Sequence, residues 1–135
     1  MSKYAEFPTT ITDGGHLAAA LKAMGFEIEC HNEPQTLMDY CRRPRSEKAT
    51  IIIRRNHTGI NASNDIGFVK GPDGAYKAII SEYDQSVKFG ASWMGELKQS
   101  YTEIRTLAMA KRKGYILQSK TKTSDGAVHL LFQAR

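Results

Sequence analysis

Three carboxylates and two arginines have residue types and spacing that could support acid and base chemistry. Asp65 opens one expected strand and Glu82 closes the next, so a tight turn between them would bring their side chains across from each other. Asp84 follows closely, and Arg54 or Arg55 on a neighbouring strand could separate the like charges. The same residues also fit a solvent-facing ion-pair network, and we favour that interpretation over an enzyme with a scattered carboxylate site.

The thiol groups of Cys30 and Cys41 and the imidazole groups of His31 and His57 are of the types that bind zinc. Cys30 and His31 are adjacent, however, and on a strand they would point to opposite faces, which makes a shared ion difficult. We therefore expect no metal site, with the two cysteines buried as small apolar residues and kept reduced.

Motifs of the large enzyme classes are absent from the sequence. It contains no Gly-rich phosphate loop, no Gly-x-Ser-x-Gly elbow, no His-Glu-x-x-His pair and no Cys-x-x-Cys pair. We expect no cofactor and favour a non-enzymatic protein.

Charge is distributed unevenly, although the net charge is only +5. Residues 1–41 sum to −4 and residues 56–104 to −2, whereas residues 42–55 sum to +5 and residues 105–135 to +6. The candidate binding residues are the basic side chains Arg42, Arg43, Arg45, Arg54, Arg55, Lys111, Arg112 and Lys113. If the two basic segments meet, they form a patch for phosphate or acidic protein; otherwise they are two solvated faces.

Hydrophobic periodicity and turn residues predict ten elements. Strands are expected at residues 7–12, 26–30, 35–40, 49–54, 65–69, 76–80, 115–121 and 127–133, and helices at about 14–24 and 92–112. The resulting order, β-α-β-β-β-β-β-α-β-β, with its many hairpins, predicts an α+β fold. Its sheet would be mostly antiparallel, with two helices packed on one face. Trp93 and Tyr101 lie at helical core spacing and are expected to pack inside.

The ends of the two expected helices look alike. Each is followed by a glycine, an aromatic residue, a strand and a hairpin return, at residues 21–28 and again at 110–117. The pattern fits an α-β-β pseudo-repeat and equally fits two instances of a common helix-to-strand junction, so both interpretations stay open.

The length of 135 residues predicts a single domain spanning residues 1–135. No apolar run approaches the length of a membrane span, and the first residues lack the apolar segment of a secretory signal. We therefore expect a cytoplasmic protein that does not insert into membranes.

A series of short segments occurs along the chain in a distinctive order: residues 7–13 (FPTTITD), 17–21 (LAAAL), 25–26 (GF), 65–68 (DIGF), 83–84 (YD), 93 (W), 99–101 (QSY), 113–115 (KGY), 125–126 (DG) and 130–131 (LL). In the order and spacing of these segments, the chain resembles an uncharacterised protein family encoded in cyanobacterial genomes and some algal plastids, with relatives in other bacteria. The family is catalogued as a domain of unknown function without assigned catalytic residues, so the resemblance implies no site.

These observations favour an interaction or assembly module that docks on another protein, with oligomer formation open. The alternative is a nucleic-acid-binding domain that uses the basic segments at residues 42–55 and 105–122.

Overall fold

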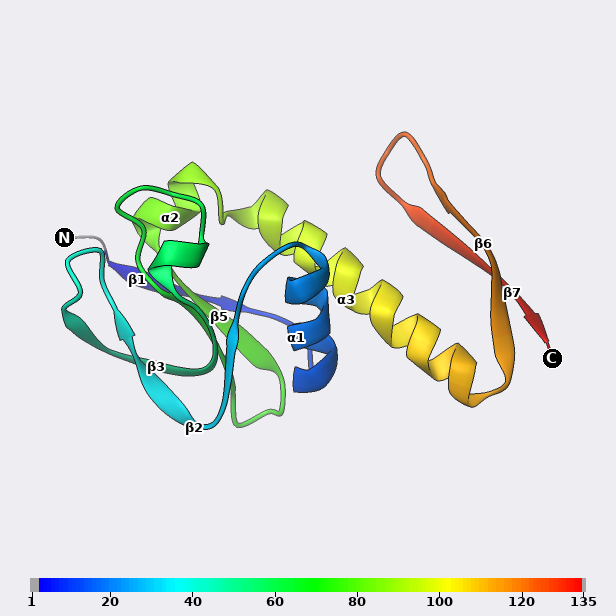
Figure 1. The fold of residues 1–135 in the computed structure, drawn as a ribbon, viewed down its shortest axis with the longest axis horizontal. Helices are drawn as coiled ribbons and strands as arrows, with labels where there is room; N and C mark the ends of the chain where they lie inside the picture. Colours follow the sequence, from blue (N-terminus) through cyan, green and yellow to red (C-terminus); the bar gives the residue numbers. More distant parts are fainter. Residues whose placement is uncertain (1–2, 135) are drawn as a thin grey trace.

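The computed structural model describes residues 3–134 of the chain. The described elements, in chain order, are β1 (Tyr4–Pro8), α1 (Gly14–Ala23), β2 (Glu29–Met38), β3 (Pro44–Ile53), the 3-10 turn η1 (Arg55–His57), β4 (Ile66–Lys70), β5 (Tyr76–Ser81), α2 (Glu82–Val87), α3 (Ala91–Arg112), β6 (Tyr115–Lys122) and β7 (Val128–Ala134). Figure 1 shows the main sheet at one end of the long axis and the β6–β7 hairpin at the other.

The main sheet has five strands in the spatial order β1-β5-β4-β3-β2, and every neighbouring pair is antiparallel. The predicted central hairpin is β4–β5, and its turn places Gly74 at a φ of 85°, a conformation that glycine adopts without strain. β1 pairs with β5 on the outer side, with Tyr4 opposite Ser81. The predicted α+β class and the antiparallel sheet are confirmed.

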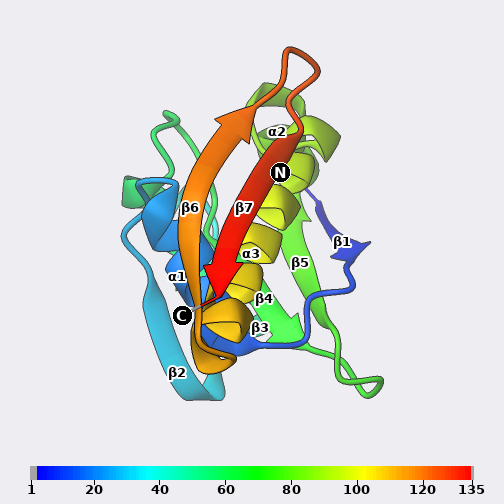
Figure 2. The ribbon, with the colours of Figure 1, turned by 90° about the vertical axis from the view of Figure 1, so that its right-hand side faces the viewer.

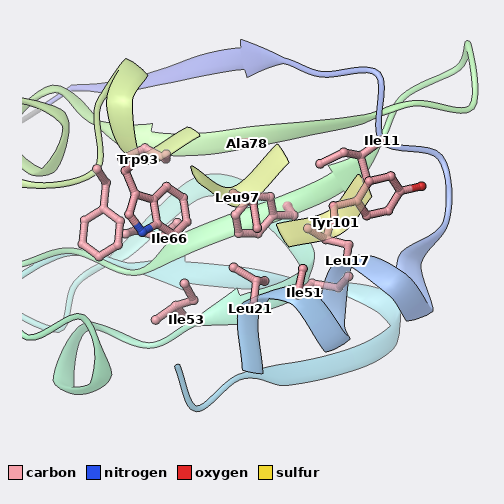
Figure 3. Close-up of a cluster of buried hydrophobic side chains, with 14 residues drawn as sticks. Ile11, Leu17, Leu21, Ile51, Ile53, Ile66, Ala78, Trp93, Leu97 and Tyr101 are labelled. Carbon is pink, nitrogen blue, oxygen red and sulfur yellow. The ribbon is translucent and has the colours of Figure 1, made fainter. Parts of the chain in front are cut away.

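Helices α1 and α3 pack against each other and against one face of this sheet (Figure 3). The strand residues that meet them are Ile51, Ile53, Ile66, Phe68, Ala78 and Ile80. Leu17 and Leu21 of α1 and Trp93 and Leu97 of α3 fill the same layer and are all buried. Burying such side chains stabilises the fold by about 1.5–3 kcal/mol each. The prediction that both long helices share one face is confirmed.

Tyr101 of α3 also fixes the start of α1. Its hydroxyl accepts hydrogen bonds from the backbone N–H groups of Thr12 and Asp13, at 3.3 and 3.1 Å. The Asp13 carboxylate in turn caps α1 by accepting from the backbone N–H of His16 at 2.9 Å. That hydrogen bond lowers the pKa of Asp13. The aromatic residue predicted as packing therefore also positions a helix end.

The two strands predicted at residues 26–30 and 35–40 are wrong as separate elements. The single strand β2 runs through both and pairs with β3, with a register shift between Cys30 and Gln35. Pro34 lies within β2 and does not end it, because β2 is at the edge of the sheet, where a missing N–H costs no ladder hydrogen bond.

A short helix, α2, follows β5 directly and was not predicted. Ser81 is its N-cap and accepts from the backbone N–H of Asp84 at 3.0 Å. Ser followed three residues later by an acidic residue resembles a capping box, and this signal was present in the sequence. Over residues 3–134 the order becomes β-α-β-β-β-β-α-α-β-β.

On the other face of the sheet, Leu37, Ala49, Ile52 and Ile79 form a second, smaller buried cluster. Gly67 of β4 lies under it. A Cβ atom at Gly67 would lie 2.5 Å from the Cβ of Ala49 and 3.1 Å from the methyl groups of Leu37. The missing side chain therefore lets the β2–β3 hairpin close over β4.

The substitution Gly67→Ala is expected to lower the free energy of unfolding by about 1–3 kcal/mol, because the added methyl overpacks this cluster. The matched control is Gly95→Ala on the exposed side of α3, where a Cβ meets no atom within 4 Å. Alanine should raise helix stability there by about 0.5–1 kcal/mol. Urea unfolding measures both, and opposite signs are expected. A neutral Gly67→Ala would show that the contact with Leu37 and Ala49 is not tight.

Candidate functional site

The two basic segments lie at opposite ends of the molecule. Arg42, Arg43 and Arg45 belong to the turn after β2 and the start of β3, whereas residues 111–113 lie at the far end of α3 (Figure 1). The side chain of Arg45 lies over the ring of Tyr4, at 5.1 Å from its centroid. The segments therefore do not merge into one patch, and each must be considered by itself.

At the sheet end, Arg54 organises a network of polar groups. Its guanidinium donates to Asp65 Oδ2 at 2.8 Å, to Glu29 Oε2 at 3.0 Å and to the carbonyl oxygen of Thr36 at 3.2 Å. The other Glu29 oxygen lies 2.8 Å from His31 Nε2. The hydrogen bond from Arg54 lowers the pKa of Glu29. The network ties the edge strand β2 to the end of β3.

Asp65 and Asp84 are buried and bind different sets of partners, so the predicted carboxylate group does not converge. Asp65 Oδ1 accepts from the backbone N–H of Arg55 at 2.8 Å, and its Oδ2 accepts from that of Met38 at 2.8 Å. Asp84 accepts from the hydroxyls of Ser63 and Ser81, each at 2.6 Å, and from Asn64. Both carboxylates fasten the loop between η1 and β4.

Glu82 is exposed at the start of α2, away from the hydrogen bonds of both aspartates. The predicted pairing of an arginine with Asp65 occurs through Arg54, but the predicted approach of Glu82 does not. The reason is α2, which turns the chain away from the sheet directly after β5.

The expectation of buried cysteines is wrong, because Cys30 and Cys41 are both exposed. Within residues 3–134, His, Cys, Asp and Glu side chains form no group of three or more that could hold a metal ion. His31 and His57 instead contact Glu29 and Glu27. None of the helices in the described part of the chain combines the length and the apolar character needed to cross a membrane.

At the opposite end, α3 extends beyond the core and carries the β6–β7 hairpin. Gly114 ends the helix with a φ of 81°, and the hairpin folds back beside α3 as a separate two-stranded sheet (Figure 2). Two polar contacts hold it there: Gln99 donates to the carbonyl oxygen of Gly126, and Lys120 pairs with Glu103. The helix and hairpin reproduce the α1-β2-β3 order, but this second hairpin does not join the main sheet.

The hairpin carries apolar side chains on both of its faces. Ile116 and Leu131 lie on the outer face and are 49% and 55% exposed. On the inner face, a groove of about 530 Å³ separates β7 from α3. Its lining includes Val128, Leu130 and Phe132 of β7 and the polar residues Lys98, Gln99, Thr102, Glu103 and Thr106 of α3. Apolar strand residues thus face a polar helix surface across a gap and are only half-buried.

Sequence reasoning predicted this hairpin but not its exposed apolar surface. The signal was the pair Leu130-Leu131, because adjacent residues of a strand point to opposite faces and two consecutive leucines therefore need two apolar surroundings. The C-terminal surface, defined as residues 109–134, combines these apolar side chains with the basic residues Lys111, Arg112, Lys113, Lys120 and Lys122.

The pairing of Glu29 with Arg54 predicts a specific pH dependence. Because the pKa of Glu29 is lowered in the folded state, its contribution is present above the ordinary carboxyl pKa and is lost as the pH falls through the folded value. Wild type should exceed Glu29→Gln in unfolding free energy by about 0.5 kcal/mol at pH 7, as for other partly exposed pairs. This excess should shrink as the pH falls below the ordinary carboxyl pKa and vanish once Glu29 is protonated in the folded protein as well.

The control for that measurement is Glu33→Gln on the same strand, since the carboxylate of Glu33 forms no ion pair with another described residue. Urea unfolding at a series of pH values compares the three proteins. An excess over Glu29→Gln that does not change with pH would contradict the pairing.

Comparison with known families matches the chain to one of them. A family model described as "Protein of unknown function (DUF1257)" matches residues 20–131, which includes most of the main sheet, α3 and most of the C-terminal hairpin. Comparisons with curated proteins and with solved structures found no significant match. The family match agrees with the resemblance seen in the sequence and assigns no site. The chain belongs to the DUF1257 family of proteins of unknown function.

Proposed function

We propose that this protein is a non-enzymatic interaction module that docks on another protein through its C-terminal surface. The observation that supports this most directly is the hairpin with apolar side chains on both faces: within residues 3–134 the inner face is only half-buried and the outer face is exposed. Isolated two-stranded hairpins are marginal in water, and those that persist pack on another layer. Here α3 supplies a polar and incomplete layer.

Binding through this surface would bury apolar side chains that remain exposed to water after folding, and this burial is a favourable free-energy change. Ile116, Leu131 and Tyr115 are each exposed by 44% or more. Fully burying an Ile or Leu side chain is worth about 1.5–3 kcal/mol, so a partner that covers these residues gains several kcal/mol before entropic costs. Exposed apolar groups that gather in this way mark interaction sites on soluble proteins.

The charge of this end defines the chemistry of the partner. Residues 105–135 contain seven basic residues and one acidic residue. A second copy placed by two-fold symmetry would bring two such basic faces together, and this repulsion disfavours a dimer through this surface. We therefore propose a different protein, with an apolar patch framed by acidic side chains.

The test is site-specific photo-crosslinking in the cells that naturally produce the protein. A photoreactive amino acid replaces Leu131 or Ile116 on the hairpin, and the matched control replaces Val87, which is also apolar and 52% exposed but lies in α2. We expect one protein to crosslink at both hairpin positions and not at Val87. Its crosslinked peptides, identified by mass spectrometry, should contain apolar residues next to acidic ones.

A charge reversal makes this test specific. The double substitution Lys113→Glu and Lys122→Glu, which keeps the Lys120–Glu103 pair that holds the hairpin to α3, should reduce the crosslink yield at Leu131 by at least about tenfold, because complementary charge becomes repulsion. Crosslinks to nucleic acid, with binding that weakens steeply as salt increases, would support the alternative of a nucleic-acid-binding domain. Crosslinking no better at Leu131 than at Val87 would refute the proposed docking surface.

A further inference from the structure

A second cleft is lined by residues of β2, of η1 and of the segments next to them. Figure 1 shows these elements and the β6–β7 hairpin at opposite ends of the molecule. The cleft has a volume of about 460 Å³, within the range of small-molecule sites. Three segments of the chain form its basic wall: Arg42 comes from the turn after β2, Arg54 from the end of β3 and Arg55 from η1. Thr36 and Met38 of β2 line another side.

The hydrogen-bonding capacity of this cleft is unbalanced. Both carboxylates in its lining are already occupied: Asp65 accepts from Arg54 and two backbone N–H groups, and Glu29 from Arg54 and His31. The guanidinium groups of Arg42 and Arg55 form no ion pair or hydrogen bond with another described residue. The cleft therefore has donors to spare and no free carboxylate to accept from a ligand, which suits an anion.

The position of Arg42 is held at a conformational cost. Its φ of 62° lies in the left-handed region, where glycine or asparagine is usual. The buried carboxylate of Asp39 maintains this turn by accepting from the backbone N–H groups of Cys41 and Arg43, both at 2.9 Å. Strained residues of this kind gather at functional sites. Here the turn projects a free guanidinium beside Arg54 and Arg55.

We propose that this cleft binds the phosphate group of a small phosphate ester. Guanidinium groups from separate segments can donate to several oxygens of one phosphate, whereas a planar carboxylate is satisfied by one bidentate arginine. Met38 is 37% exposed at the cleft and offers an apolar contact for the organic part of the ester. An ester should therefore bind more tightly than inorganic phosphate.

Isothermal titration calorimetry at low salt tests this with two probes, inorganic phosphate and phenyl phosphate. We expect saturable one-to-one binding of both, with phenyl phosphate at least threefold tighter. The double variant Arg42→Gly and Arg55→Gln should weaken binding at least tenfold, because two charged donors are lost. Glycine suits the left-handed position, so this variant should unfold at a temperature no lower than that of Arg55→Gln alone.

The matched control is Arg112→Gln with Lys113→Gln, which removes two cations from the opposite end and should leave phosphate binding unchanged. The proposal is refuted if neither probe binds saturably up to about 10 mM, or if the Arg42→Gly and Arg55→Gln double variant binds both probes like wild type. It is also refuted if a single-stranded oligonucleotide binds and the small phosphates do not. Because the cleft and the C-terminal surface share no residue, either proposal can fail alone.

Discussion

The architecture depends on one constraint, which is that α3 is longer than the layer it covers. Its first half packs Trp93, Leu97 and Tyr101 into the core, where Trp93 also contacts the ring of Phe89 at 4.8 Å between centroids. At 1.5 Å per residue its 22 residues span about 33 Å, against about 15 Å for the ten residues of α1. The second half therefore extends past the sheet and carries the hairpin with it (Figures 1 and 2).

This extension separates two surfaces with different properties. The sheet end has a cleft whose arginines are positioned by buried hydrogen bonds to Asp65 and Asp39. The far end has apolar side chains on a hairpin that only a few polar contacts hold to α3. In our proposals, the first surface orients a small charged group and the second buries apolar area against a partner. The two surfaces share no residue, so covering one leaves the other accessible.

Much of the fold follows from local sequence signals. The β4–β5 and β6–β7 hairpins depend on nearby turn glycines, and both long helices on their own periodicity, so the sequence predicts them well. The continuity of β2 through Pro34 depends on that strand being at the sheet edge, which is a tertiary property. The exposure of the two cysteines also results from the edge position of β2, because Cys30 lies in this strand and Cys41 lies in the turn that follows it. Local periodicity contains no information of this kind.

The candidate sites were predictable in composition but not in arrangement. An arginine next to Asp65 was expected, and Arg54 fills that role, because β3 and β4 are antiparallel neighbours joined by one loop. The separation of Arg42 from Lys113 depends on the direction of α3, which spacing along the chain does not reveal. The apolar character of the hairpin was visible in the sequence, but its exposure follows from the absence of a covering layer among residues 3–134.

The central claim is that the C-terminal hairpin is an incomplete layer which a partner completes. Amide hydrogen exchange on the isolated chain, shown to be monomeric by sedimentation, tests it most directly. The account predicts that amides of β6 and β7 exchange through local opening, at least about 100-fold faster than those of β4 and β5, which open only on global unfolding. Protection of the hairpin in the isolated monomer equal to that of β4 would contradict it, because the hairpin would then already be complete.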